Sequence, residues 1–242
     1  MRVLDAIVLA LVGLEVLNQL YMAVYTRFER AIDKRRLAAR AAETPVTDEG
    51  KKPSFIRRAY HYFERFSYGL MRYNLLRVGH VPSFAIRRIL YRFVYCMDIT
   101  RNTKIHGGCE IRSPWNIRAD NCVVGVGCIL DGRSGIAIGQ NVVFGSGVHV
   151  WTQEHAVDDP LFRVLAENSQ PVTIADRAWI CSDTTILPGC KIGEGAVVAA
   201  RACVTRDCEP FGVYGGIPAK KLKTRNPELV YQLEKRPTWF FY

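Results

Sequence analysis

Aliphatic residues recur at every sixth position over much of the second half of this 242-residue chain. Neither an α-helix, with a period of 3.6, nor an alternating strand, with a period of 2, produces that interval over such a length. The interval predicts a three-sided coil of short parallel strands, in which each side places one branched residue in a narrow core and the coils stack. The expected core positions form five coils: Ile99, Ile105, Ile111, Ile117, Val123 and Ile129; Ile138, Phe144 and Val150; and Ile174, Ile180, Ile186, Ile192, Val198 and Val204.

Small residues support this phase. Gly139, Gly145 and Gly193 directly follow core positions, where a backbone turn is least costly with glycine. None of the eight cysteines forms a C-x-x-C pair, so we expect reduced thiols, in a cytosolic protein, that serve as compact hydrophobic residues and bind no metal. A small residue follows each core position of the last block after four residues: Ala178, Thr184, Cys190, Ala196, Ala202 and Cys208.

The first segment, residues 1–41, is apolar and then basic. Its stretch from 6 to 24 is long enough to span a bilayer but contains Glu15, Asn18 and Gln19, which are costly in lipid. Two interpretations stay open. One is a membrane anchor whose following arginines keep the next domain cytoplasmic. The other is a self-associating helix, because apolar and polar residues alternate four and three apart as in a coiled coil: Ile7, Leu11, Leu14, Asn18, Tyr21, Tyr25, Phe28 and Ile32.

The remaining divisions follow from composition. Residues 42–53 form a polar linker, and residues 54–98 a basic, aromatic helical segment that suits either a membrane surface or an ordinary solvated face. The net charge of +10 favours an anionic partner, but no nucleic-acid recognition motif is present. Residues 99–208 form the coiled domain, and residues 209–242 a C-terminal cap with a helix around Pro227 to Lys235.

The run "VTIADRAWICSDTTILPGCKIGEGAVVAARACVTRDCEPFGVYGGIPAKKL" resembles the hexapeptide-repeat O-acetyltransferases, in particular the maltose, galactoside and colanic-acid types. Upstream, "CILDGRSGIAIGQNVVFGSGVHVWTQEH" resembles the branch that modifies capsular or exopolysaccharide sugars. The resemblance covers about residues 75–225. It implies a mainly β fold, the left-handed parallel β-helix, and a homotrimer that binds acetyl-CoA between subunits. It also implies acetyl transfer to a hydroxyl of a sugar or polysaccharide precursor, in the cytoplasm and at the inner face of the membrane.

The resemblance also assigns site residues. The loop 152–172 interrupts the repeat, and its His155 matches the family's catalytic base, which takes a proton from the acceptor hydroxyl. Asp131 is a candidate contact for that hydroxyl. The positions that match cofactor contacts are Trp179, which borders the thioester and acceptor, and Ser182, Ala200, Thr205, Arg206 and Lys223.

Several positions depart from the family pattern. Cys181 and Arg201 stand where glycine is usual, and Ala156 follows the histidine where many relatives have aspartate. These departures keep a second hypothesis open: a catalytically impaired, membrane-associated trimeric scaffold. The galactoside acceptor class does not transfer, because Gly125 and Arg133 replace its asparagine and aspartate.

A γ-type carbonic anhydrase is a further alternative with the same fold. That activity requires three histidines on one zinc ion. His149 and His155 are six residues apart, so they would lie on successive sides of the coil, and the other histidines come well before them. We therefore expect no metal site.

Overall fold

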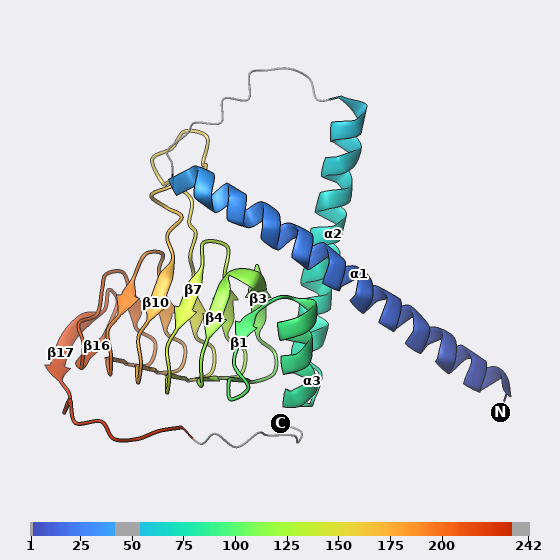
Figure 1. Ribbon diagram of the computed structural model, residues 1–242. Helices are drawn as coiled ribbons and strands as arrows, with labels where there is room; N and C mark the ends of the chain where they lie inside the picture. Colours follow the sequence, from blue (N-terminus) through green and yellow to red (C-terminus); the bar gives the residue numbers. More distant parts are fainter. Residues whose placement is uncertain (1, 42–53, 234–242) are drawn as a thin grey trace.

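The computed structural model describes residues 2–41 and 54–233. Three helices stand at one end of a three-sided stack of short strands (Figure 1). The helices are α1 (Arg2–Ala41), α2 (Phe55–Gly79) and α3 (Phe84–Ile89), and α3 continues into a π-helical turn, η1 (Leu90–Val94). The strands of the stack are β1 (Asp98–Ile99), β2 (Lys104–Ile105), β3 (Glu110–Arg112), β4 (Ile117–Ala119), β5 (Val123–Val124), β6 (Ile129–Asp131), β7 (Ile136–Ile138), β8 (Val143–Phe144), β9 (His149–Val150), β10 (Val172–Ile174), β11 (Trp179–Ile180), β12 (Thr185–Ile186), β13 (Lys191–Ile192), β14 (Val197–Val198) and β15 (Cys203–Val204).

Every third strand joins the same sheet, as a three-sided coil requires. The three sheets have the orders β1-β4-β7-β10-β13, β17-β16-β14-β11-β8-β5-β2 and β15-β12-β9-β6-β3. We call them the first, second and third sheets. Pairing is parallel up to β16 (Gly212–Gly215), and only β17 (Lys220–Thr224) returns antiparallel. Fifteen strands make five coils, and β16 begins a sixth. The expected hexapeptide-repeat β-solenoid is therefore confirmed.

The predicted core positions are buried, with two exceptions. Val123 and Ile129 point outward, and the residues that stack on Ile105 and Ile111 are Val124 and Leu130. The cause is the corner before them, where a 3-10 turn, η2 (Pro114–Asn116), adds residues to the coil. The two outward positions were therefore predicted wrongly, because a strict interval of six ignores an enlarged corner.

Coil length explains where the strict interval holds. Ile99 stacks on Ala119, twenty residues later, whereas Ile174 stacks on Ile192, eighteen residues later. Only the later coils therefore consist of three exact hexads. The six small residues of the last block are all buried, as expected.

Glycines at the corners make room for the next coil. A Cβ at Gly139 would lie 2.2 Å from Asp176 Oδ1, and one at Gly145 would lie 2.5 Å from the amide nitrogen of Ser182. Gly193 meets the following coil in the same way. None of the three has a positive φ. Their role is therefore close packing between coils rather than the turn conformation that the sequence suggested.

The thiols are free and mostly buried. Burial raises the pKa of Cys122 and of Cys208 to about 12, and that of Cys190 to about 11. These side chains therefore stay protonated at neutral pH and pack as small hydrophobic groups.

The middle of α1 crosses α2 within the same chain. Asn18 and Asn74 donate to each other at 2.8 and 3.1 Å, and the Arg77 guanidinium lies 2.9 Å from the Glu15 carboxylate. Glu15 and Asn18, which are costly in lipid, are thus paired with α2, and the Gln19 amide donates to Glu15 at 2.8 Å. The coiled-coil stripe from Asn18 to Tyr25 has an intramolecular partner, and Phe28 is exposed, so the self-association hypothesis is not needed to explain that part of the stripe.

α3 closes the first end of the solenoid. Arg87 is buried and donates to the carbonyls of Val81 and Ile105, the latter at 3.0 Å. Its guanidinium also lies over the Phe84 ring at 4.5 Å. One arginine therefore ties α3 to β2.

The C-terminal segment differs from its prediction. Residues 227–233 contain no helix, and residues 42–53 and 234–242 lie outside the described part of the chain. The segment lies against a solenoid edge instead: the Tyr231 hydroxyl donates to the Arg177 carbonyl at 2.9 Å, and Asn141 Oδ1 accepts from the amide of Leu233 at 2.9 Å. Bonds to the solenoid replace the bonds that a helix would make within itself.

Candidate active site

The loop that carries His155 leaves one edge of the solenoid. At this edge the chain passes from the third sheet to the first, at residues 113–116, 132–135, 151–171 and 187–190 in successive coils, and residues 205–208 leave β15 at the same edge. We call it the loop edge. The loop between β9 and β10 extends from it toward the C-terminal half of α1 (Figure 1).

His155 has a defined tautomer. Its Nδ1 lies 2.6 Å from the carbonyl oxygen of Phe162, and the two rings stack with centroids 4.2 Å apart and planes 3° from parallel. A carbonyl only accepts, so Nδ1 must donate its hydrogen. Nε2 of the neutral ring then carries a lone pair, the state that a general base requires. The imidazole itself is exposed in the single chain.

A turn braces this arrangement. Asp159 accepts from the amide of Arg163 at 2.8 Å, and from its guanidinium at 2.7 and 3.0 Å. Hydrogen bonds from Arg163 hold the pKa of Asp159 below its usual range. The amide of Ala156 donates to the Arg163 carbonyl at 2.9 Å, which closes the turn behind His155. Asp159 therefore stabilises this turn.

Asp131 is buried and already engaged. Its two carboxylate oxygens accept from Arg133 at 2.7 and 2.8 Å, and its carbonyl accepts from the Thr152 hydroxyl at 2.7 Å. Arg133, not Asp131, reaches the surface beside the loop. The carboxylate orients that guanidinium, so a direct contact between Asp131 and an acceptor requires Arg133 to move.

Trp179 lies on the outer face of the second sheet and is half exposed. Its register neighbours are Val143 and Val197. Together with Val143, it faces Arg225 and Tyr231 of the C-terminal segment across a shallow groove of about 220 Å³. The structure places this ring on a different side of the solenoid from the loop edge.

The other cofactor positions divide between two edges. Ser182 and Ala200 stack at the edge between the second and third sheets, where the amide of Arg201 donates to the Ser182 carbonyl at 3.0 Å. Thr205 and Arg206 follow β15 at the loop edge, and Lys223 lies on β17. A single chain therefore does not gather these residues.

Arg201 adopts the left-handed conformation, with φ 59°. Its guanidinium lies 3.7 Å from Asp183, and both side chains are exposed. The substitution of an expected glycine thus strains the backbone at a corner, but its side chain turns outward to solvent.

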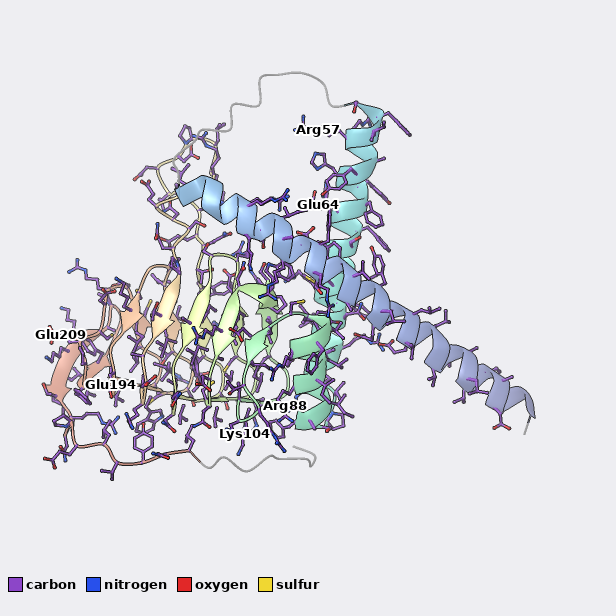
Figure 2. The ribbon with its side chains drawn as sticks, viewed as in Figure 1. Arg57, Glu64, Arg88, Lys104, Glu194 and Glu209 are labelled. Carbon is purple, nitrogen blue, oxygen red and sulfur yellow. The ribbon has the colours of Figure 1, made fainter. Side chains whose placement is uncertain are left out.

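Sequence reasoning did not find a cavity of about 380 Å³ at the loop edge. Its walls come from α1, α2 and three coils, and Gln153, two residues before His155, is among them. The Arg36 guanidinium bridges two walls, 3.0 Å from Glu64 of α2. Glu64 lies on the side of α2 next to the C-terminal half of α1 (Figure 2). The one available signal was Glu64 itself, the single acid in a basic stretch.

The described residues contain no group of three His, Cys, Asp or Glu side chains that could hold a metal ion. His149 lies on the outer face of the third sheet beside Trp151, with ring centroids 6.1 Å apart. It is therefore separated from the loop turn that holds His155.

Comparison with known proteins supports this fold. The family model "Bacterial transferase hexapeptide (six repeats)" matches residues 171–206. The chain thus contains the hexapeptide repeat of bacterial transferases, and it is similar to acetyltransferases that carry this repeat. It is 50% identical over 52 residues to chloramphenicol acetyltransferase of Klebsiella aerogenes, over 22% of this chain and 25% of that protein. It is 33% identical over 91 residues to galactoside O-acetyltransferase of Escherichia coli, over 38% of this chain and 45% of that protein.

A solved hexapeptide-repeat acetyltransferase extends the comparison. The Vibrio cholerae protein complexed with acetyl coenzyme A is 25% identical, with a TM-score of 0.54, over 62% of this chain and 82% of that one. The curated relatives above are matched over less than half of their own length. The matched part of this chain is therefore limited, and what is said of α1 and α2 comes from the structure of this chain alone.

Proposed function

We propose that this protein transfers the acetyl group of acetyl-CoA to a hydroxyl group of a sugar or glycan. The observation that carries the proposal is the tautomer of His155, whose Nε2 is free to accept a proton on a loop that leaves the solenoid. The names of its relatives support the donor, because a solved relative is complexed with acetyl-CoA. They divide on the acceptor, which is chloramphenicol in one name and a galactoside in another.

The reaction balances with one base. Nε2 of His155 takes the hydroxyl proton while the oxygen attacks the thioester carbonyl. The tetrahedral intermediate then collapses, its C–S bond breaks, and the CoA thiolate takes the proton back from Nε2. Products are the O-acetyl ester and free CoA, so no acyl-enzyme is needed. Phe162 keeps the ring in the correct tautomer through both steps.

We propose that the working site forms between copies of the chain in a homotrimer. Ser182 and Ala200 lie at one edge of the third sheet, and His155 and Arg206 come from the other. Two copies placed edge to edge would bring these groups to one donor molecule. Arg206 and Lys223 suit the phosphates of the cofactor.

We also propose that the protein rests on an anionic membrane surface. α1 is long and apolar enough to cross a membrane by length and composition, and its N-terminal end extends past α2, away from the solenoid (Figure 1). The apolar stretch without polar side chains ends at Leu14, because the next residue, Glu15, pairs with Arg77 of α2. Residues 6–14 cover roughly 14 Å at about 1.5 Å per residue, half of a hydrocarbon core of about 30 Å. The tip therefore enters one leaflet rather than spanning both.

Two measurements test the enzymatic proposal. Isothermal titration with acetyl-CoA measures donor binding, and thiol release in the presence of sugar acceptors measures transfer. The proposal expects both signals. Absence of binding at millimolar acetyl-CoA would instead favour a trimeric scaffold, the role that Ala156 and Arg201 suggest.

A further inference from the structure

The cavity at the loop edge contains a buried carboxyl group, Glu29. Glu29 of α1 is 5% exposed, and within the described chain it makes no ion pair. Burial raises the pKa of Glu29, and the charges of Glu64 and Asp33 add to that rise, while the charge of Arg36 opposes it. A buried carboxyl group of this kind is costly unless hydrogen bonds satisfy it. Its neighbour in the wall is the Tyr25 hydroxyl, which is also buried.

The charges of the wall select the kind of ligand. Two of the guanidinium groups are already paired, Arg36 with Glu64 at 3.0 Å and Arg133 with Asp131 at 2.7 Å. The wall therefore offers neither a free cluster of cations for an anion nor a free cluster of carboxylates for a cation. Its charged members balance three against three: Glu29, Asp33 and Glu64 against Arg36, Arg65 and Arg133.

Aromatic rings supply the rest of the lining. Trp115 and Tyr68 border the cavity, and the Trp115 indole donates to Asp33 at 2.8 Å, which fixes its ring. A volume of about 380 Å³ falls within the usual range of small-molecule pockets. The aromatic rings offer flat apolar surfaces, and the carboxyl and guanidinium groups beside them offer hydrogen bonds. A sugar ring matches this combination, because its faces are apolar and its hydroxyl groups lie around its rim.

The location connects the cavity to the reaction. Gln153 lines it and belongs to the loop that carries His155 two residues later. The Gln153 amide donates to the hydroxyls of Ser134 and Ser169 at 3.0 and 3.1 Å, so this end of the loop is fixed to the solenoid. A molecule held in the cavity is therefore positioned at the base of the catalytic loop.

We propose that this cavity binds one neutral sugar unit of the acceptor, with Glu29 as its central hydrogen-bonding group. This inference rests on the proposed function for the identity of the acceptor. The walls from α1 and α2 make the N-terminal helices part of acceptor recognition. A hydroxyl of the bound ring satisfies Glu29, and the next unit of the glycan reaches toward His155.

Saturation-transfer NMR of the full chain tests the proposal with three probes: methyl glucoside, methyl galactoside and glucuronate. We expect a saturation-transfer signal from at least one of the two neutral glycosides. The signal from glucuronate should be at least tenfold weaker. Glu29→Leu should abolish the signal, whereas Glu29→Gln, which keeps hydrogen bonding, should retain at least a third of it. Glu194→Leu, at an exposed acid of a later coil, is the matched control and should change nothing.

Two further readouts keep the outcomes separate. Arg65→Trp, at an exposed wall position, should block the cavity without disturbing the core, and circular dichroism verifies that each variant is folded. Unchanged sugar binding in folded Glu29→Leu and Arg65→Trp would overturn the cavity assignment, as would the absence of binding by either neutral glycoside. Failure of acetyl-CoA binding with intact sugar binding would overturn the enzymatic proposal instead.

Discussion

The Nδ1 atom of His155 lies 2.6 Å from the carbonyl oxygen of Phe162, and the two rings are stacked. The backbone of one residue thus sets the tautomer of the other, while the phenyl ring holds the imidazole plane. Phe162 itself adopts a left-handed conformation, with φ 48°, which aims its carbonyl back at the histidine. A small turn, closed by Asp159 and Arg163, therefore fixes the orientation of the proposed base within the single chain.

Removal of the imidazole should stop catalysis without unfolding the chain. We expect His155→Ala to lower kcat by roughly a hundredfold or more, because general bases contribute about that factor. The KM for acetyl-CoA should hold, since the ring acts on the acceptor proton. Phe162→Leu keeps the carbonyl and loses the stacking, so it should lower kcat by only about two- to tenfold. Steady-state thiol release measures both, and wild-type turnover in His155→Ala would remove this residue from the mechanism.

A second prediction concerns the strained corner at Arg201. A residue other than glycine in the left-handed region costs about 1–2 kcal/mol, and the exposed pair with Asp183 offsets little of it. We expect Arg201→Gly to raise the free energy of unfolding by about 0.5–1 kcal/mol in urea titrations. The control is Arg118→Gly on the extended strand β4, which should destabilise the chain because glycine weakens a strand. Equal losses in both variants would show that the corner is not strained.

The sequence predicted the solenoid because its core is one-dimensional. Each hexad supplies one buried residue, so the pattern of Ile174, Ile180 and Ile186 needs no distant partner to be recognised. The prediction that Val123 and Ile129 face the core was wrong, because an enlarged corner before them shifts the register. Local insertions of this kind leave the hydrophobic pattern almost unchanged, so the spacing alone cannot locate them.

The candidate site was less predictable because its contacts are distant in sequence. Glu29 and Gln153 line one cavity although more than a hundred residues separate them. The two halves of the α1 stripe likewise read as a coiled coil until Asn18 is seen to bond Asn74. A resemblance to known enzymes pointed to His155, but the resemblance begins at about residue 75, near the end of α2, so it carries almost no information on α1 and α2.

The raised pKa of Glu29 makes a stability prediction with a definite sign. Below the unfolded value the carboxyl is protonated in both states, and the folded chain suffers no penalty. As the pH rises through the folded value, the unfolded chain ionises first, so the wild type loses stability relative to Glu29→Gln. The groups that face this carboxyl are Tyr25, Asp33, Arg36 and Glu64.

The opposite behaviour is expected of Glu64, which serves as the control. Burial alone would raise its pKa, but hydrogen bonds from Arg36 and His61 hold the value below the ordinary one. Its contribution is present above the unfolded pKa and is lost as the pH falls toward 3. Urea titrations of wild type, Glu29→Gln and Glu64→Gln between pH 3 and 8 measure both trends. Parallel curves for the two variants would contradict the assignment.

Membrane association should depend on the tip of α1. Leu11 and Leu14 are both more than 60% exposed, and burial of two such side chains in lipid contributes roughly 3–6 kcal/mol. Leu11→Glu with Leu14→Glu should therefore lower binding to vesicles of anionic phospholipid by at least tenfold in flotation assays. The matched control, Val157→Glu with Leu161→Glu, alters two exposed apolar residues of the loop and should keep vesicle binding. Equal losses from both pairs would contradict the proposed role of α1.

Cys181 offers a chemical probe of the donor position. It is partly exposed beside Ser182, at the edge where the sequence places cofactor contacts, whereas most of the other thiols are buried. Burial still raises its pKa, so alkylation by iodoacetamide should be slow at pH 7 and faster at pH 9. Saturating CoA should slow labelling of Cys181 by at least fivefold if the pantetheine arm lies along this corner. Cys203, also partly exposed, lies on the third sheet and gives the reference rate in the same peptide map. Equal protection of both thiols would indicate a general change in exposure, and protection of neither would place the cofactor elsewhere.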